Sequence, residues 1–329
     1  MRRGVQDGKT THTPAPPLDA AARRAAVLAA ACRRAGLRGR ALVIAAPYLW
    51  LGLFFFVPFL IVLKISFAQM ILAQPPFTDV FVWREGWWPQ LQGSLDNYRW
   101  LLQDALYALA YLSSLQIALI ATLACLFIGY PMAYGIARAP RTVRTLLLLL
   151  VILPFWTSFL LRVYAWIGIL KQNGILNNAL MGLGVIDAPL PMLHNDFAVY
   201  LGIVYSYLPF MILPLYANLE KLDGNLLEAA ADLGARPWRT FLTVTLPLSW
   251  PGILAGSMLV FIPAVGEYVI PELLGGPDTL MIGKILWVEF FNNRDWPVAS
   301  AVTIVLILVL VIPLVLLQRQ QAKVEAARG

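Results

Sequence analysis

Apolar residues fall into six long blocks that are separated by shorter polar segments. The blocks occupy residues 41–67, 111–137, 145–170, 197–219, 248–270 and 296–317. A helix of about 20 apolar residues crosses the hydrocarbon of a bilayer, where a lone segment must satisfy its own backbone N–H and C=O groups. The pattern therefore predicts an all-α integral membrane protein with six transmembrane helices. Internal prolines make the fourth and fifth blocks the weakest of the six.

Composition supports the same class. Hydrophobic residues make up 60% of the 329 residues and charged residues 13%, whereas a soluble domain carries about a quarter charged residues. The first block is too long for the core of a signal peptide and no cleavage pattern follows it, so we expect it to be retained. The two cysteines, Cys32 and Cys125, lie in a basic tail and an apolar block, and we expect both thiols to be unpaired.

Lys and Arg residues are distributed unequally between the segments that join the blocks. Most of the 25 lie before residue 41, after residue 317, or in the second and fourth connecting loops. Because basic residues are retained on the cytoplasmic side, both termini are predicted to be cytoplasmic. The organisation expected is a basic tail over 1–40, partly disordered, a permease domain over 41–317 and a short tail over 318–329. The basic tail favours contact with membrane lipid over a nucleic acid.

The opposite loops are acidic on balance, and their carboxylates include Glu272, Glu289 and Asp295. A negative vestibule raises the local concentration of cations. The alternative is that the exclusion of Lys and Arg from outer loops produces this balance without any link to a substrate.

Residues for catalysis are not found in a usable arrangement. No phosphate-binding loop occurs, because the pair Gly283 and Lys284 lacks both the upstream glycine and the following hydroxyl. His12 and His194, the only histidines, are far apart in the chain. The sequence predicts a protein that is not an enzyme and that binds no metal or cofactor, so that any ATP and Mg would lie on another chain.

The loop over 220–247 has the pattern of two short helices around a glycine. Residues 226–233 are strong helix formers, Gly234 suits the left-handed position after a helix end, and Pro237 suits the first turn of the next helix. Two short helices are marginal alone, which indicates a surface that binds a partner. The alternative is an amphipathic surface helix without one.

This loop resembles the signature of bacterial ABC-importer permeases: E-A-A at Glu228, three residues, Gly234, nine residues, then I-x-L-P, with Val244 in place of isoleucine. The resemblance implies a type I ABC-importer permease fold, in which a cytoplasmic coupling helix seats on an ATPase subunit. The residues that it assigns to ATPase coupling are Glu228, Ala229, Ala230, Asp232, Gly234, Arg236, Pro237, Val244, Leu246 and Pro247.

The stretches 256–278 and 290–297 resemble permeases of the polyamine family, most closely the first of the two permease subunits of putrescine importers. That resemblance implies a bacterial inner-membrane complex with a second homologous permease, an ATPase homodimer and a periplasmic substrate-binding protein. Putrescine is the substrate it favours. The same architecture for spermidine or another solute, and an ion-coupled secondary transporter, are the alternatives.

Glu267 lies inside the fifth block, beside Gly266 and shortly after Pro263. A carboxylate at mid-membrane costs about 2.5–3.5 kcal/mol on insertion scales and usually faces a pathway or a partner. We expect it to receive an ammonium group of the substrate, with Tyr268 and Trp156 offering aromatic faces to the cation. The alternatives are an ion pair of Glu267 with Arg162 or Lys64, or a position near the outer interface.

Overall fold

The computed structural model describes residues 39–82 and 90–326, so the predicted basic tail lies almost entirely outside the described residues. The chain divides into two compact units, Met1–Ile61 and Val62–Gly329, and each is considered separately.

The described part of the first unit is a single apolar helix that continues to Ile65. It comprises α2 (Gly39–Leu51), the π-helix η1 (Gly52–Phe56) and α3 (Val57–Ile65). The stretch Val43–Ile65 is long and apolar enough to cross a bilayer, and none of its most apolar window is buried. Lipid is the solvent that suits such a surface, in agreement with the first predicted span.

The second unit contains the remaining elements. They are β1 (Phe81–Val82), β2 (Gln90–Leu91), α4 (Asp96–Gln103), α5 (Ala105–Arg138), α6 (Arg141–Ile152), η2 (Leu153–Trp156), α7 (Phe159–Leu170), α8 (Ile175–Gly182), α9 (Asp196–Leu219), α10 (Gly224–Asp232), α11 (Pro237–Thr240), η3 (Phe241–Thr245), α12 (Leu246–Leu248), α13 (Trp250–Val265), α14 (Val269–Leu274), α15 (Ile282–Trp287), η4 (Val288–Asn292) and α16 (Trp296–Ala326). The two short strands pair antiparallel.

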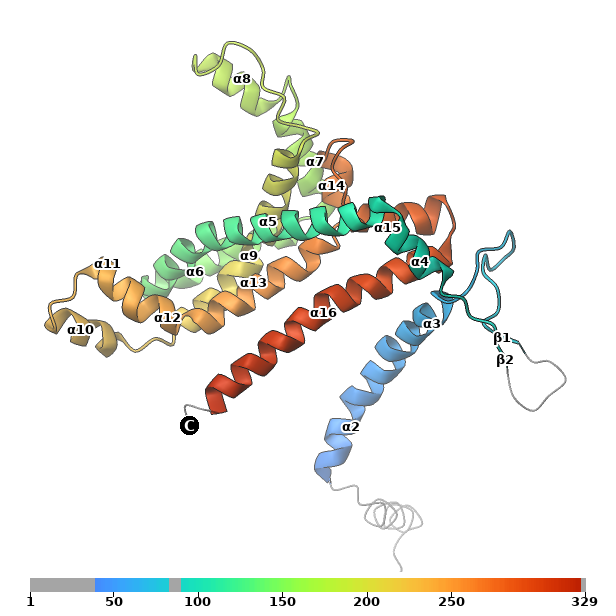
Figure 1. Ribbon diagram of the computed structural model, residues 1–329. Coiled ribbons are helices and arrows are strands. Elements are labelled where there is room, and N and C mark those ends of the chain that lie inside the picture. Colours follow the sequence, from blue (N-terminus) through green and yellow to red (C-terminus); the bar gives the residue numbers. More distant parts are fainter. Residues whose placement is uncertain (1–38, 83–89, 327–329) are drawn as a thin grey trace, which may run out of the picture. The chain divides into compact units, whose positions relative to one another are not determined.

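Helices α5, α9 and α13 pack against one another and form the core of this unit (Figure 1). Glycines allow the close approach. A Cβ at Gly252 of α13 would lie 2.7 Å from Cβ of Asn218 on α9, and one at Gly129 of α5 would lie 3.0 Å from Cγ of Met211. Small residues at helix contacts are the usual means of tight packing between membrane helices. The free thiol of Cys125 is buried in this core.

The third predicted span, 145–170, is wrong as a continuous helix. The structure breaks it into α6–η2 and α7, which meet at 90°. Thr157 and Ser158 have extended backbone between the two parts. Pro154 lacks an N–H donor and so removes one hydrogen bond from an α-helical ladder, and the Thr157 hydroxyl donates to the Pro154 carbonyl at 2.8 Å. The segment is a bent pair of helices.

The fifth predicted span, 248–270, is also divided. Helix α13 ends at Val265 with Gly266 as its C-cap, and α14 begins at Val269. The break therefore falls at Gly266, while Pro263 lies inside α13. At its other end α13 meets the 237–248 segment at a bend of 65°.

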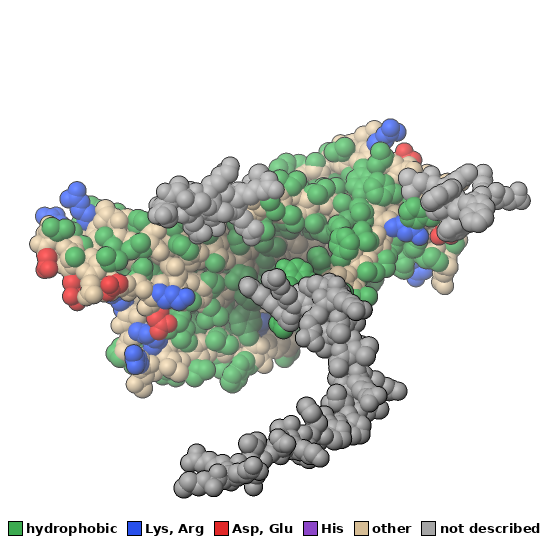
Figure 2. Space-filling model, turned by 90° about the horizontal axis from the view of Figure 1, so that it is seen from below, with side chains coloured by type: hydrophobic (Ala, Val, Ile, Leu, Met, Phe, Trp, Pro, Cys, Tyr) green, Lys and Arg blue, Asp and Glu red, His purple; other side chains and the backbone are tan. Residues whose placement is uncertain are grey.

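Among the described residues, three helices are long and apolar enough to span a membrane, and five segments qualify if each bent pair counts as one. Helix α16 contributes a shorter apolar stretch, Trp296–Ile312. The count of six thus stays a prediction, while the all-helical, multi-pass character is confirmed. In the space-filling view, hydrophobic side chains cover the middle and charged side chains gather toward the ends (Figure 2).

Candidate functional site: a coupling segment and a buried carboxylate

The segment around Gly234 has the helix–glycine–helix structure that the sequence predicts. Helix α10 starts after Asp223, whose side chain accepts from the Asn225 amide at 3.0 Å. Gly234 has φ +78° and donates to the Ala231 carbonyl at 2.8 Å, and Ala235 donates to the Ala230 carbonyl at 3.0 Å. These two bonds are a Schellman motif. Pro237 then starts α11, also as predicted.

The middle of this segment projects apolar side chains into solvent. Leu233 is 88% exposed and Trp238 is 62% exposed, on either side of the Gly234 turn. Glu228, Asp232 and Arg236, which belong to the predicted coupling set, are exposed as well. Large exposed apolar groups rimmed by polar residues mark interaction surfaces, so this turn is suited to binding another protein.

The far end of the segment is anchored on α5. Phe241, the first residue of η3, meets the rings of Tyr130 and Tyr134 edge to face, with centroids 5.5 and 6.0 Å apart. The Tyr130 hydroxyl lies 2.9 Å from the Ser249 hydroxyl at the bend before α13. Val244 lies inside the π-helix η3, while Leu246 and Pro247 lie in α12. The signature thus covers the whole route from α10 to α13.

Glu267 lies at the opposite end of α13 and is buried, with 8% of its surface exposed. One carboxylate oxygen accepts from the amides of Val269 at 3.0 Å and Ile270 at 3.4 Å, at the start of α14. The other oxygen accepts from the Tyr207 hydroxyl on α9. Glu267 therefore caps α14 and ties it to α9, a role that the sequence did not indicate.

The ion pair of Glu267 with Arg162 or Lys64, which the sequence left open as an alternative, is absent among the described residues. In the described part of the chain, the ion pairs are Arg99–Asp96, Arg144–Glu220 and Lys284–Glu272. Arg162 instead lies over the Phe155 and Phe159 rings, at 5.5 and 5.7 Å, and Lys64 lies over the Phe81 ring. The carboxylate of Glu267 thus has hydrogen bonds but no cation among these residues.

Of the two aromatic residues expected beside Glu267, only Tyr268 stacks on another ring among the described residues. The Tyr268 ring stacks on Trp287 of α15, with centroids 4.4 Å apart and planes 10° apart, and Trp287 in turn contacts Phe291. Trp156 is 75% exposed and has no stacked ring among the described residues. Its neighbour Phe155 contacts Phe210, which contacts Tyr207.

Sequence reasoning missed Tyr207 and Gly283. Both hold the Glu267 turn, since a Cβ at Gly283 would lie 2.5 Å from the carbonyl oxygens of Gly266 and Glu267. The signal at Tyr207 was only that of one aromatic residue among many in the fourth block.

Glu289, which was predicted to lie in an outer loop, lies in a helical part of that connection. Glu289 is buried in η4, where it accepts from the Tyr107 hydroxyl at 2.9 Å and from the Asn293 amide at 2.8 Å. Apolar residues on both sides of it extend α15 into a π-helix, and a donor from α5 satisfies the carboxylate that this buries.

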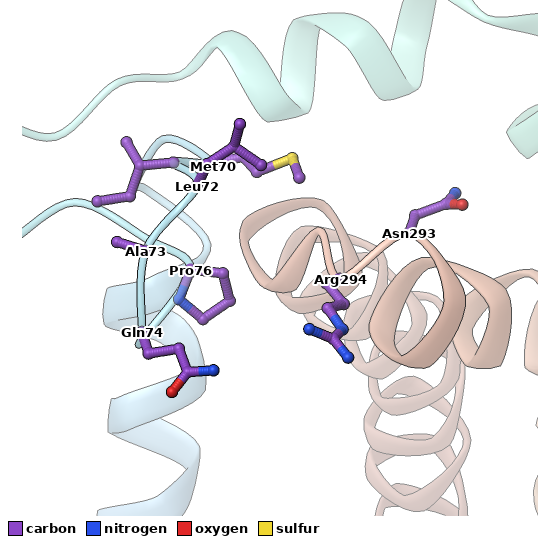
Figure 3. A pocket seen from close by; sticks show the side chains of 8 residues that line it. Met70, Leu72, Ala73, Gln74, Pro76, Asn293 and Arg294 are labelled. Carbon is purple, nitrogen blue, oxygen red and sulfur yellow. The ribbon is translucent and has the colours of Figure 1, made fainter.

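A shallow cleft of about 360 Å³ lies between the loop after α3 and the turn after η4. Figure 3 shows side chains from Met70 to Pro76 on one side and those of Asn293 and Arg294 on the other. Its only charged lining residue is Arg294, which makes it unsuited to a cationic ligand. In the residues that the structure describes, no group of three or more His, Cys, Asp or Glu side chains could hold a metal ion.

Comparison with known proteins gives consistent results. The family model described as binding-protein-dependent transport system inner membrane component matches residues 125–323. The chain is 46% identical over 257 residues to the spermidine/putrescine transport system permease protein PotB of Escherichia coli K12, covering 78% of this chain and 88% of that protein. The homologous protein of Haemophilus influenzae is 42% identical over 266 residues, with coverages of 80% and 88%.

A more distant relative and a solved structure extend the pattern. The inner membrane ABC transporter permease protein YdcU of Escherichia coli K12 is 33% identical over 279 residues, covering 81% of this chain and 85% of that protein. A chain from the crystal structure of a bacterial ABC transporter involved in the import of the acidic polysaccharide alginate matches with TM-score 0.62 and 17% identity. That match covers 90% of this chain and 98% of the other, and it bears on the fold alone.

Proposed function

Because the chain belongs to the family of binding-protein-dependent transport system inner membrane components, we propose that it is the permease subunit of an ATP-binding-cassette importer for a polyamine. It would lie in the inner membrane with six spans and both termini in the cytoplasm. Its partners would be a homologous second permease, an ATPase homodimer that carries ATP and Mg, and a periplasmic substrate-binding protein. The chain itself would bind no cofactor and catalyse no reaction.

The observation that carries the coupling part of this proposal is the exposed turn around Gly234. Leu233 and Trp238 project from two short helices, which are marginal without a partner to dock on. A groove on the ATPase subunit would take these side chains. Only a partner that contacts them differently in its ATP-bound and ATP-free states could drive a change in the permease.

Helix α13 supplies the connection between the two candidate sites. It starts beside the 237–248 segment and ends beside Glu267, 16 residues or about 24 Å later. Its tight packing on α9 at Gly252 and Gly256 makes the two helices move together. A displacement of the coupling segment would therefore reach the Glu267 turn, as alternating access between the two sides of the membrane requires.

The substrate assignment rests on Glu267 and on the relatives. Those that are 42–46% identical are named for spermidine and putrescine, and a buried carboxylate that pairs with no cation in the described part of the chain suits the ammonium group of a substrate. We propose putrescine as the preferred substrate. Spermidine is the second candidate, because one carboxylate does not measure the length of a polyamine.

The coupling part is tested by co-purification of the ATPase subunit with the tagged permease. Leu233→Ser should release the ATPase. Leu183→Ser is a matched control, because Leu183 is 77% exposed and is likewise the C-cap of a short helix, α8, followed by a left-handed glycine, Gly184. It should retain the ATPase. Equal recovery of the ATPase with both variants would refute binding of the ATPase at the turn around Gly234.

The substrate part is tested by uptake in proteoliposomes that contain the whole complex and a panel of diamines and triamines. Glu267→Gln should lower uptake at least tenfold with the complex intact. Glu272→Gln, in the exposed ion pair on α14 with Lys284, is the control and should transport normally. Wild-type rates for Glu267→Gln would remove the substrate role, and uptake without the ATPase would favour a secondary transporter.

A further inference from the structure

The side chain of Arg144 joins three elements at the end of the bundle that carries α10 and α11. Its Nη1 lies 2.6 Å from Oε1 of Glu220, the C-cap of α9. Its Nη2 donates to the carbonyls of Ala137 at 2.9 Å and Ala139 at 3.2 Å, where α5 ends. One guanidinium on α6 thus satisfies carbonyls that a helix end leaves open and binds a carboxylate on a different helix.

The place of Glu220 in the chain gives this contact its importance. Asp223, the N-cap of α10, lies three residues further on, so Glu220 holds the ion pair at the base of the exposed coupling segment, with Leu222 packed on the core between the two residues. The other end of that segment is fixed on α5 by Phe241 and Ser249, through Tyr130 and Tyr134. The segment is therefore tethered at one end to Arg144 of α6 and at the other end to α5, and it is exposed between the tethers.

We propose that Arg144 is a positioning residue for energy coupling: it fastens the base of the coupling segment to the corner between α5 and α6, so that displacement of α10 turns this corner together with α9. This rests on the proposed importer function and adds a second route for the movement, beside the one through α13. Without the tether, the short turn between Glu220 and Asp223 would absorb part of the displacement.

The exposure of the pair separates this role from a purely structural one. The Arg144 and Glu220 side chains are 21% and 42% exposed, and ion pairs that are open to water contribute little to stability. The pKa of the Glu220 carboxyl lies below its ordinary value because of hydrogen bonds from Tyr216 and Arg144, so the acid is ionised at neutral pH. Loss of the pair should thus affect movement more than folding.

The test measures ATP hydrolysed and polyamine imported in the same proteoliposomes, with the complete complex of permeases and ATPase subunits. Glu220→Gln and Arg144→Gln should each lower the number of molecules imported per ATP by about fivefold or more, the lower end of usual coupling energies. The double variant should be no worse than the worse single one. Arg99→Gln, which removes an exposed ion pair on α4, should leave the ratio unchanged.

The outcomes distinguish this proposal from the one on which it rests. If the wild-type complex imports nothing with ATP, the importer function itself fails. If the wild type is coupled and both variants keep its ratio within twofold, Arg144 has only a structural role. Should Arg144→Gln fail to assemble, Glu220→Gln decides alone, since it leaves the bonds from Arg144 to α5 in place.

Discussion

At the scale of single residues, Gly283 shows how tightly the Glu267 turn is held. Helix α15 begins beside the backbone of Gly266 and Glu267, and an alanine Cβ at 283 would lie 2.5 Å from both carbonyl oxygens. Backbone atoms cannot move aside as a side chain can. The fixed position of Glu267 therefore depends on a residue that carries no functional group.

Gly283→Ala should destabilise the protein by about 1–3 kcal/mol, the usual cost of overpacking. Gly168→Ala in α7, where a Cβ would meet nothing within 4 Å, should instead be neutral or stabilise by about 0.5–1 kcal/mol, because alanine favours a helix over glycine. Thermal unfolding of both variants in the same detergent measures the difference. Equal melting temperatures would show that α15 does not press on this turn.

Sequence alone identified Glu267 but not its neighbours, for a physical reason. A carboxylate in an apolar block is expensive, so it attracts attention without any structural knowledge. Tyr207 lies 60 residues away on α9, and a tyrosine in an apolar block is equally consistent with packing or with an interface. The helix-capping role of Glu267 also depends on the place where α13 ends, which a hydrophobicity pattern does not fix to one residue.

At the scale of elements, a side chain at Gly234 in the Schellman turn would be opposed by the backbone conformation alone and not by any neighbouring atom. A Cβ there would meet nothing within 4 Å, and the φ of +78° is the only obstacle to a side chain. The same holds for Gly184 after α8, with φ +69°. Each glycine follows the C-terminus of a short helix, α10 or α8, so the two positions can be compared directly.

Gly234→Ala and Gly184→Ala should each cost about 1–2 kcal/mol locally, the penalty of a left-handed residue with a Cβ. Only Gly234→Ala should reduce polyamine-stimulated ATP hydrolysis by the assembled complex, because only its helix is proposed to dock on the ATPase. ATPase assays on both complexes, after a check of subunit stoichiometry, provide the comparison. A similar loss with Gly184→Ala would point to general destabilisation.

The start of α16 carries a pH-dependent cap. Asp295 accepts from the Val298 amide at 3.0 Å, and its pKa is raised, chiefly by burial and also by the nearby Glu289 carboxylate, against the lowering effect of that amide. The folded protein thus holds this proton to higher pH than the unfolded chain. The contribution of Asp295 to stability is present at low pH and declines as pH rises through its folded pKa.

Asp295→Asn keeps the acceptor oxygen but removes the titration. The difference in melting temperature between wild type and variant should therefore shift against the wild type as pH rises from the ordinary carboxyl pKa of about 3.9 toward neutrality. A thermal-unfolding series in one detergent across that interval measures it. A constant difference would mean that Asp295 titrates normally.

The bent third segment marks the limit of prediction at this scale. Its composition predicts a span as well as any other block does, and hydropathy does not distinguish a straight helix from two helices at 90°. Pro154 was visible, but prolines inside helices are tolerated in membranes. Indeed Pro131, Pro209 and Pro214 lie inside unbroken α5 and α9. What differs is the extended backbone at 157–158, which depends on tertiary packing.

At the scale of the whole molecule, the class of the protein could be predicted from the sequence because hydrocarbon requires every spanning segment to be apolar and to satisfy its own backbone hydrogen bonds. The all-helical architecture was predicted, and so was the helix–glycine–helix at 224–240. The number of crossings was not fixed, because a bent pair can cross the membrane or return to the same side. The packing of α5, α9 and α13 depends on glycine contacts between distant blocks, which no local pattern reveals.

The locations of the two chain ends decide between five and six crossings. With the six proposed spans, reporters fused at the N-terminus and at the C-terminus should both respond as cytoplasmic. With an odd number of crossings they would lie on opposite sides. Paired fusions to a reporter active only in the cytoplasm and one active only in the periplasm measure this. Opposite signals would show an odd number of crossings, in which either one bent pair is a re-entrant loop or α16 does not cross.

Glu267 caps α14 with the same carboxylate that we propose receives the substrate, and this limits how the protein can be altered. Most exchanges at this position would remove the acceptor for the first two amides of α14 together with the negative charge, whereas Glu267→Gln keeps an acceptor oxygen. Substitution of Tyr207 leaves in place both hydrogen bonds that the backbone amides of Val269 and Ile270 donate to Glu267. A change of substrate preference should therefore be sought first at Tyr207, because substitution there alters the surroundings of the Glu267 carboxylate and keeps the start of α14.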